Sequence, residues 1–122
     1  MLLASRLIGA SKEQIEAECH IEEDCIFLDA EGILEPVALF EVMAQSFAAG
    51  SGLVYPVPWG YLAGMKRTRV FALARAGDTL RCEVRPIAQI DSIAVIDGAV
   101  FREGERLAEG QFKIYLPSGD WQ

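Results

Sequence analysis

Histidine is almost absent from this sequence, since His20 is the only one in 122 residues. Basic residues are scarce as well: 11 lysines and arginines stand against 18 aspartates and glutamates, which gives a formal net charge of −7. Nucleic-acid phosphates would repel such a chain, so we do not expect nucleic acid as a partner. No cluster of side chains has the spacing of metal ligands, and we therefore expect no metal site.

Long apolar runs and paired cysteines are also missing. No run approaches the roughly 20 residues that span a bilayer, and the first residues lack the pattern of a signal peptide. The three cysteines, Cys19, Cys25 and Cys82, are odd in number and show no C-x-x-C spacing. We therefore expect free buried thiols in a cytoplasmic protein that has no membrane partner.

Three common catalytic and nucleotide-binding motifs do not occur. The sequence contains no G-x-x-x-x-G-K-S/T, no G-x-G-x-x-G and no G-x-S-x-G. Their absence disfavours nucleotide-dependent chemistry and serine hydrolysis, and we expect no cofactor.

The residues that are present favour one compact domain. The hydrophobic fraction is 52%, which is enough for a substantial core. No repeat, linker or low-complexity tract divides the chain, so we expect a single domain over residues 1–122.

One segment is predicted to be a buried helix, from Pro36 to Gly50. Proline suits a first helical position, and Gly50 or Gly52 would end the helix. Apolar residues fall on every side of it, as in a core helix. Glu41 and Gln45, four residues apart, share one face of this apolar segment. An unpaired carboxylate is costly to bury, so Glu41 is a candidate functional residue.

Most of the remaining chain alternates with period two and is predicted to be strand. In 79–90, Leu80, Cys82 and Val84 alternate with charged residues, and Pro86 indicates an edge position or a bulge. The other predicted strands cover residues 2–9, 12–22, 61–71, 92–101 and 106–116. The prolines in 55–60 predict a loop, and 76–78 and 103–105 are predicted turns.

This order of elements predicts an α+β fold. One long apolar helix would be wrapped by a curved antiparallel sheet of about five to six strands. Part of the helix and the other face of the sheet would remain uncovered, which indicates a dimer.

Three short motifs resemble a known family. Residues 41–45, Glu-Val-Met-Ala-Gln, resemble the E-A-M-A-Q helix motif of hotdog-fold 3-hydroxyacyl-[acyl-carrier-protein] dehydratases of fatty-acid synthesis. Residues 62–65 resemble the F-A-G-I strand of that family, and 76–78 resemble its P-G-D turn. The variant Trp-Gly-Tyr-Leu-Ala-Gly at 59–64 is closer to a divergent branch found in aryl-polyene and related pathways. The resemblance extends over residues 2–117 and implies a hotdog fold.

The resemblance implies a catalytic pair contributed by opposite subunits of a dimer. A histidine before the helix removes the α-proton, and the helix carboxylate protonates the leaving hydroxyl. Glu41 takes the place of this acid, with Gln45 in support. Phe27 stands where the histidine is expected. The family's backbone N–H donor for the thioester carbonyl falls at Pro36, which has no N–H, or at Val37 if one gap is allowed.

Further candidate residues follow from the same placement. Those expected along the acyl chain are Phe27, Val37, Phe40, Gly64 and Met65; Phe47, Tyr55 and Trp59 are either core or tunnel lining.

Lys66, Arg67 and Arg69 form a basic patch that is either a solvated strand or a docking site for an acidic carrier protein or a phosphate. His20 reads most simply as an exposed strand residue, although it could replace the missing base. Asp29, Glu31 and Glu35 are carboxylates in the loop where the base should be.

Three functions remain open from the sequence. The first is a dehydratase-like lyase that acts on acyl thioesters of acyl carrier protein or coenzyme A, with its base supplied by another subunit. The second is a non-catalytic hotdog subunit that pairs with a His-bearing dehydratase. The third is a thioesterase that uses the helix carboxylate. The partnership would be a homodimer in the first case or a heterodimer in the first two.

Overall fold

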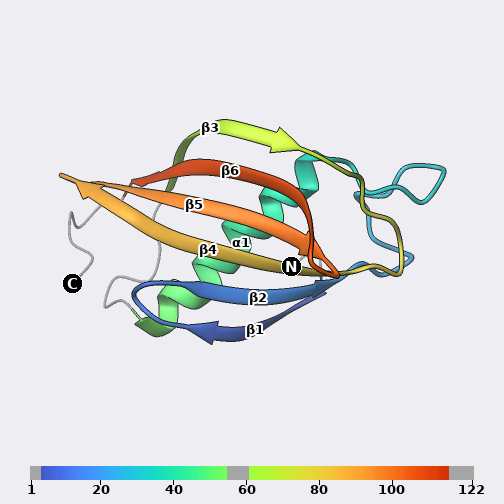
Figure 1. Ribbon diagram of the computed structural model, residues 1–122, viewed down its shortest axis with the longest axis horizontal. Helices are drawn as coiled ribbons and strands as arrows, with labels where there is room; N and C mark the ends of the chain where they lie inside the picture. The colour runs from blue at the N-terminus through green and yellow to red at the C-terminus, as the bar shows by residue number, and fades with distance from the viewer. Residues whose placement is uncertain (1–3, 55–60, 116–122) are drawn as a thin grey trace.

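A computed structural model describes residues 4–54 and 61–115 of the chain. In that part of the chain, six strands form one sheet, and a single helix packs against it (Figure 1). In chain order these elements are β1 (Ala4–Ala10), β2 (Ile15–His20), α1 (Val37–Val54), β3 (Tyr61–Val70), β4 (Thr79–Ile90), β5 (Ile93–Arg102) and β6 (Glu105–Tyr115).

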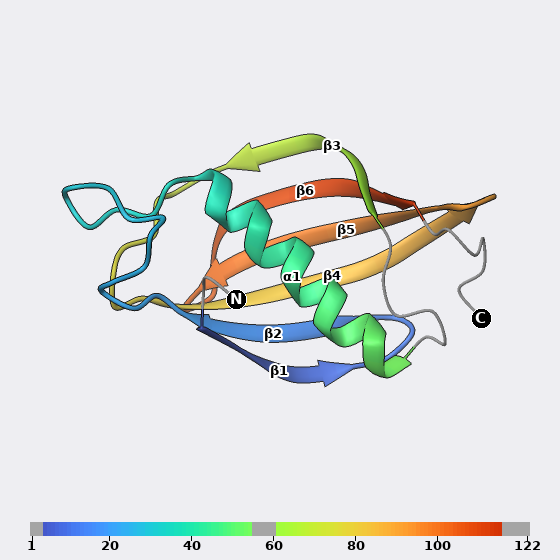
Figure 2. The ribbon, with the colours of Figure 1, turned by 180° about the vertical axis from the view of Figure 1, so that it is seen from behind.

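The strands form one antiparallel sheet in the order β1-β2-β4-β5-β6-β3. Figure 2 shows α1 crossing one face of this sheet diagonally, and no helix of the described residues lies on the opposite face. The predicted α+β architecture, with one long helix against an antiparallel sheet, is therefore confirmed. The expected loop at 55–60 and the predicted strand ends at residues 2–3 and 116 lie outside the described residues.

The two-residue period of the sequence determines which side chains face the helix. In β2, Ile15, Ala17 and Cys19 are buried while the residues between them are not. In β4, Leu80, Cys82 and Val84 are buried in the same alternating manner. Apolar side chains of both strands thus cover the helix-facing side, while their charged residues lie on the outer face of the sheet.

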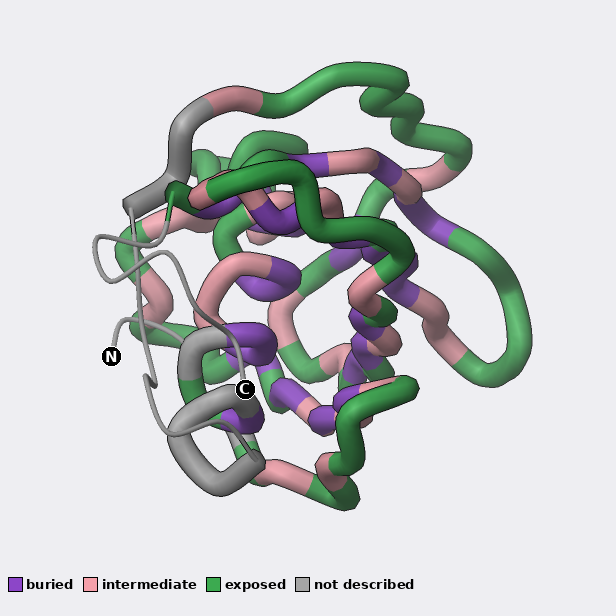
Figure 3. Tube along the Cα trace, turned by 90° about the vertical axis from the view of Figure 1, so that its left-hand side faces the viewer, coloured by how far each residue is buried: buried purple, intermediate pink, exposed green. Residues whose placement is uncertain are grey.

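The helix supplies the other half of the core. Its buried face consists of positions spaced three or four apart: Ala38, Leu39, Val42, Met43, Ser46, Phe47 and Gly50. Ser46 is the only polar residue among them, and its hydroxyl donates to the carbonyl of Val42 at 2.7 Å. Figure 3 shows the buried segments gathered in the middle of the molecule, between the sheet and the helix.

The predicted end of the helix was wrong. Neither Gly50 nor Gly52 stops α1, which continues to Val54. Gly50 instead marks a close approach to β2, because a Cβ atom there would lie 2.8 Å from both Cγ1 and Cδ1 of Ile15. A glycine that reads as a helix stop in the sequence is therefore a packing residue. Pro36 directly precedes the helix, and Val37 is the first helical residue.

The prediction for Pro86 was partly right. β4 is an inner strand of the sheet, and its register shifts between Pro86 and Ala88, as at a bulge. The alternation expected to continue through Ala88 and Ile90 is lost beyond this shift, where both residues are exposed. Figure 2 shows this end of the β4–β5 hairpin extending past the end of the helix, away from the side chains of α1 that cover the rest of the sheet.

Two turns follow the predicted positions. Glu103 and Gly104 connect β5 to β6 with φ of 50° and 82°. Two positive φ values in a two-residue hairpin loop are the signature of a type I′ turn. Gly77 has φ of 90° in the turn before β4, a conformation that glycine adopts without steric cost.

The loops at one end of the molecule are tied together by backbone hydrogen bonds. Leu34 N–H donates to Ala74 O at 2.8 Å, and Ala76 N–H donates to Gly32 O at 3.0 Å. These bonds join residues 21–36 to residues 71–78, and both segments lie beside the start of α1. The segment that carries Phe27 is therefore a folded loop.

Candidate functional site

Glu41 lies on the face of α1 that points away from the sheet. Its side chain is exposed, whereas Val42 and Met43, the next two residues, are buried. Gln45 Nε2 donates to Glu41 Oε1 at 3.0 Å, as expected for residues one helical turn apart. The expectation of a carboxylate buried within this chain was wrong, because the helix packs against the sheet through its opposite face. Glu41 is thus open to a partner molecule.

Val37 lies one turn before Glu41 on the same exposed face. Its side chain is 67% exposed, a large fraction for an apolar residue. Its N–H makes no hydrogen bond with any described residue, while the next two N–H groups donate to Glu35 O and Pro36 O. The first N–H groups of a helix carry partial positive charge and can polarise a carbonyl. The helix start therefore offers an acid and an N–H donor together.

Phe40 lies on the flank of the helix nearest β6 and β3. It is half-buried, and a Cβ atom built on Gly110 would lie 3.3 Å from the Phe40 ring and 3.3 Å from Thr68. Met65, in β3 opposite Phe112 of β6, is 39% exposed, and Gly64 is half-buried. Met65 shares the helix side of the sheet with Phe112, while Gly64, the residue before it, lies opposite the exposed Lys113 on the outer side. No contact among the described residues joins Gly64 or Met65 to Glu41.

Phe27 belongs to the loop before the helix and packs partly buried against the core. Its carbonyl accepts a hydrogen bond from Glu35 N–H at 2.8 Å, which fixes the loop directly before α1. Phe27 does not cover Glu41, since that carboxylate is exposed. The position expected to hold a base thus carries a side chain that can only pack.

The other carboxylates of this loop differ in their hydrogen bonding. Asp29 Oδ1 accepts hydrogen bonds from the N–H groups of Glu31 at 2.8 Å and Ile33 at 3.0 Å. This pattern stabilises a tight turn, so Asp29 has a structural task. Glu31 and Glu35 are exposed, and no described contact directs either carboxylate towards Glu41.

His20 is far from the role of a base for Glu41 in the same chain. It is exposed at the end of β2, where Nδ1 lies 3.0 Å from Thr79 Oγ1. Its neighbours Cys19 and Ile21 point to the helix side and are buried. His20 therefore lies on the outer face of the sheet, with the sheet between it and the helix.

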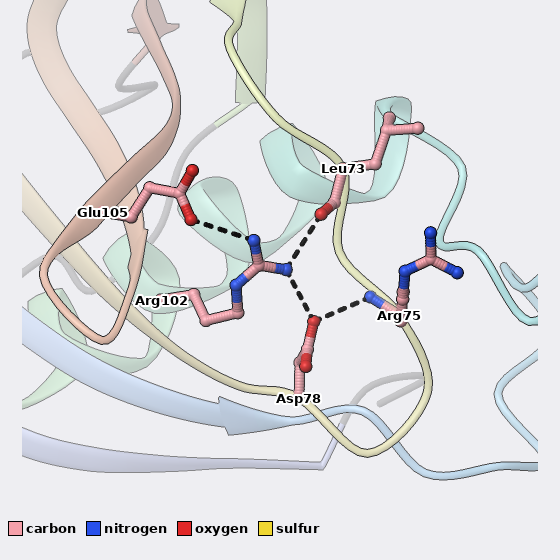
Figure 4. Close-up of polar contacts among 5 residues, drawn as sticks. All are labelled: Leu73, Arg75, Asp78, Arg102 and Glu105. Atoms are coloured by element: carbon pink, nitrogen blue, oxygen red, sulfur yellow. Dashed lines mark hydrogen bonds and ion pairs between the residues drawn. The ribbon is translucent and has the colours of Figure 1, made fainter.

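Asp78 of the 76–78 motif stabilises the loops beside the site (Figure 4). Its Oδ2 accepts from Arg75 N–H and from Arg102 Nη1, each at 2.9 Å. Arg102 also donates to Leu73 O and Glu105 Oε1 at 2.9 Å. Partial burial alone would raise the pKa of Asp78, but these hydrogen bonds and the arginine charges outweigh it and lower the pKa. The sequence did not identify Arg102, because nothing links it to Asp78 along the chain.

The basic patch of β3 is shaped by a bulge. Lys66 lies opposite Gln111 and Arg69 opposite Glu109, with a register shift between them. Arg67 within the shift has φ of 55°, which is uncommon for a residue with a side chain. Without the shift, Lys66 and Arg69 would face opposite sides of the sheet. The bulge brings both to the outer face, and all three basic side chains are exposed.

The cysteines behave as packing residues. All three are free; Cys19 and Cys82 are buried, and Cys25 is half-buried. Burial raises the pKa of Cys19 to about 11 and that of Cys82 to about 12. Thiols with such pKa values are not nucleophiles near neutral pH.

The described residues contain neither a candidate metal site nor a candidate membrane span. No group of three or more histidine, cysteine, aspartate or glutamate side chains is placed to hold a metal ion there. No helix in those ranges is long and apolar enough to cross a bilayer.

A family model described as ApeP-like, ApeP dehydratase, matches residues 1–122. No curated protein matches the chain significantly. Among solved structures, the dehydratase heterocomplex ApeI:P from Xenorhabdus doucetiae has a TM-score of 0.82 at 22% identity, covering 96% of this chain and 83% of that chain.

Two further solved structures show the same fold at lower identity. A hypothetical thioesterase with coenzyme A from Streptococcus pneumoniae has a TM-score of 0.80 at 12% identity, covering 98% of this chain and 92% of that one. The PaaI protein from the phenylacetic acid degradation operon of E. coli has a TM-score of 0.78 at 14% identity, covering 91% and 82%. The architecture shared with these proteins is the hotdog fold.

Proposed function

Because this chain belongs to the ApeP-like dehydratase family, we propose that it handles acyl thioesters and contributes the acid to a dehydratase site completed by a second subunit. The observation that carries the proposal is the position of Glu41. It is an exposed helix carboxylate with no histidine beside it, since the one histidine of the sequence lies on the other face of the sheet.

The proposed reaction is the elimination of water from a 3-hydroxyacyl thioester. A base of the partner subunit removes a proton from C2, and the C2–C3 double bond forms as the C3–O bond breaks. Glu41 in its protonated form gives a proton to the departing hydroxyl, which leaves as water. The Val37 N–H would donate to the thioester oxygen as negative charge develops there. Gln45 would hold the carboxyl in position through its 3.0 Å hydrogen bond.

The partner is proposed to be a related hotdog subunit that carries the histidine missing at position 27. A homodimer would place Phe27 opposite both copies of Glu41, so neither site would contain a histidine. The solved ApeI:P structure is a heterocomplex, which supports this kind of partnership as a hypothesis for the present chain. The exposed face with Val37 and Glu41 is the surface that such a subunit would cover.

The substrate is proposed to arrive on an acyl carrier protein or coenzyme A. Lys66, Arg67 and Arg69 lie exposed on one edge strand, where an acidic carrier could dock. Phe27, Phe40, Gly64 and Met65 are the proposed contacts of the acyl chain. We place the protein in the cytoplasm, where such carriers are used.

A paired assay tests this function. The purified chain alone should not dehydrate a 3-hydroxyacyl carrier substrate, while the chain with a His-bearing hotdog dehydratase should. Glu41→Gln in the complex should lower kcat about 10²–10⁴-fold. Glu13→Gln is the matched control, because it removes the same charge from an exposed turn on another element. Normal turnover by the chain alone, unaffected by Glu41→Gln, would refute the proposal.

Thioester hydrolysis is the second candidate function. A lone exposed carboxylate can activate water or attack a thioester without a histidine. Hydrolysis of acyl-coenzyme A or acyl carrier protein by the chain alone, lost in Glu41→Gln, would support it over dehydration. Dehydration by the complex that Glu41→Gln leaves unchanged would instead support the role of a non-catalytic subunit.

A further inference from the structure

The outer face of the sheet has a hollow that the proposed reaction does not use. Its volume is about 310 Å³, near the lower end for small-molecule sites. Residues of β3, β4, β5 and β6 and Gln14 of the β1–β2 turn line it. The helix with Glu41 packs against the other face, so the hollow and the dehydratase site are separated by the sheet (Figure 2).

The hollow exists because a short side chain lies amid long ones. Ala99 of β5 lies between Glu83 of β4 and Glu109 of β6 in the sheet register. Small residues at 98 and 99 therefore form the floor, and long charged side chains of the neighbouring strands form the walls. Ala99 is only 8% exposed although it belongs to the outer face, which shows that these walls surround it.

Three arginines from three strands line the walls: Arg67 of β3, Arg85 of β4 and Arg106 of β6. Arg106 is already paired with Glu109 at 3.0 Å. Among the described residues, neither Arg67 nor Arg85 is paired with a carboxylate; Arg85 Nη2 donates only to the neutral Gln14 Oε1 at 3.3 Å. Two guanidinium groups thus remain available for an anion.

The bulge in β3 explains how Arg67 reaches the hollow. Its φ of 55° lies in the left-handed region, which costs of order 1 kcal/mol for a residue with a side chain. The register shift around it turns the strand locally, and Arg67 lines the hollow from the sheet edge. Strain retained at a residue that lines a hollow is typical of a binding site.

The acidic wall residues restrict the ligand further. Glu83 and Glu109 are paired with arginines at 2.8 and 3.0 Å, but Asp97 has no ion pair within the described part of the chain. Asp97 lies beside Arg85 in the register and also lines the hollow. A ligand should therefore carry an anionic group for the arginines and a hydroxyl or amino donor for Asp97.

We propose that this hollow binds a small phosphate ester whose remainder carries hydroxyl or amino groups. A phosphate has enough oxygens to accept from two planar guanidinium groups at once, whereas one guanidinium already satisfies a carboxylate. The volume of about 310 Å³ exceeds what a bare phosphate fills, and it leaves room for the donor-bearing part beside Asp97.

Calorimetric titration with glycerol 3-phosphate tests the proposal, with glycerol and inorganic phosphate as separate probes. The wild-type chain should bind glycerol 3-phosphate saturably and glycerol not at all. Ala99→Leu fills the floor without changing any charge, and Arg85→Gln removes one donor group; each should weaken binding about tenfold or more. Arg6→Gln is the matched control, since it removes the same charge from β1 at the far end of the sheet.

One variant is expected to bind more tightly, a result that misfolding could not produce. Among the described residues of the hollow, Asp97 is the one carboxylate without an ion pair; Asp97→Asn removes its charge, so inorganic phosphate should bind about two- to tenfold more tightly. Parallel titration with 4′-phosphopantetheine distinguishes two sources of the phosphate ester, the arm of a carrier and a free small molecule. Tighter binding than glycerol 3-phosphate points to the carrier arm, and equal or weaker binding points to a free ester.

Two results would overturn the proposal. One is the absence of saturable binding of glycerol 3-phosphate up to about 10 mM, well above the range of a specific weak site. The other is binding that Arg6→Gln weakens as much as Ala99→Leu and Arg85→Gln do. Neither result bears on dehydration, because none of the substituted residues takes part in the proposed reaction at Glu41.

Discussion

At the scale of single residues, two positions decide what this chain can contribute to catalysis. Glu41 retains a carboxylate on an exposed helical face, supported by Gln45. Phe27, at the position where the resemblance to dehydratases places a base, packs against the core. A proton donor without a proton acceptor performs half of an elimination, so these two side chains make a second subunit necessary to the proposed dehydration.

Asp78 is the residue on which the loops beside α1 depend. It joins the backbone of Arg75 to the guanidinium of Arg102, and Arg102 in turn holds Leu73 and Glu105. The aspartate of the 76–78 motif therefore stabilises the fold. It directly follows Gly77, whose positive φ forms the turn.

Asp78→Asn should lower the free energy of unfolding at pH 7 by about 1–2 kcal/mol, because a charged acceptor at a partly exposed site is lost. The pKa of Asp78 is lowered in the folded state. Its stabilisation is therefore complete above the unfolded pKa of about 4 and disappears as the pH falls through the folded pKa. Urea unfolding from pH 7 to pH 2 should show a smaller acid loss in Asp78→Asn than in the wild type. Equal acid losses in both, or a similar effect from Asp24→Asn in an exposed loop, would contradict this role.

At the scale of elements, the contact of α1 with β2 sets how closely the helix lies on the sheet. Gly50 allows this approach, since a Cβ atom there would meet the side chain of Ile15. Glu41 lies about two and a half turns earlier on the same helix, so this packing also sets the position of the Glu41 carboxylate.

Gly50→Ala should destabilise the fold by about 1–3 kcal/mol through overpacking, although alanine favours helix by about 1 kcal/mol over glycine. Thermal unfolding measures the change. The double substitution Gly50→Ala with Ile15→Ala removes the opposing atoms and should cost less than the sum of the two single changes. Additive costs would show that the helix shifts to accommodate the added methyl group, and that the contact between Gly50 and Ile15 does not limit its approach to β2.

The bulge of β3 is the second element with a functional consequence. It places Lys66 and Arg69 on the same face of the sheet, where strict alternation would separate them. A basic edge strand of this kind can attract an acidic carrier protein through charge.

Lys66→Glu combined with Arg69→Glu should raise KM for a carrier-bound substrate in the active complex about tenfold or more. Added salt should reduce the difference between wild type and variant, because exposed charges are screened. Arg6→Glu on β1 controls for net charge. A KM that rises equally with a carrier-free pantetheine thioester would place these residues in the substrate site and not in docking.

At the scale of the whole molecule, much of the fold follows from the sequence. The period-two pattern of residues 79–90 predicts β4 with its observed bounds, and the helix is found within a few residues. Both depend on local patterns of apolar residues. The close approach at Gly50 and the link between Asp78 and Arg102 join distant segments, so no local pattern reveals them.

The candidate site is less predictable than the fold for a related reason. The motif located Glu41, but an apolar helix reads as buried all round, while one chain covers only its sheet-facing side. The bulge that gathers the basic residues leaves no local sequence signature. The hollow with Arg85 and Asp97 requires the register of four strands, although the alternating charges of β4 hint at a charged outer face.

For the whole molecule, the proposed dehydratase site is composite: Glu41 of this chain supplies the acid, and a partner subunit supplies the base. The most direct measurement is the dehydration rate of the heterocomplex in which the partner's own helix carboxylate has been neutralised. With Glu41 intact, dehydration should persist, and with Glu41→Gln in the same complex its rate should fall about 10²-fold or more. A rate that vanishes when the partner's carboxylate is neutralised and does not change with Glu41→Gln would show that the site does not use Glu41.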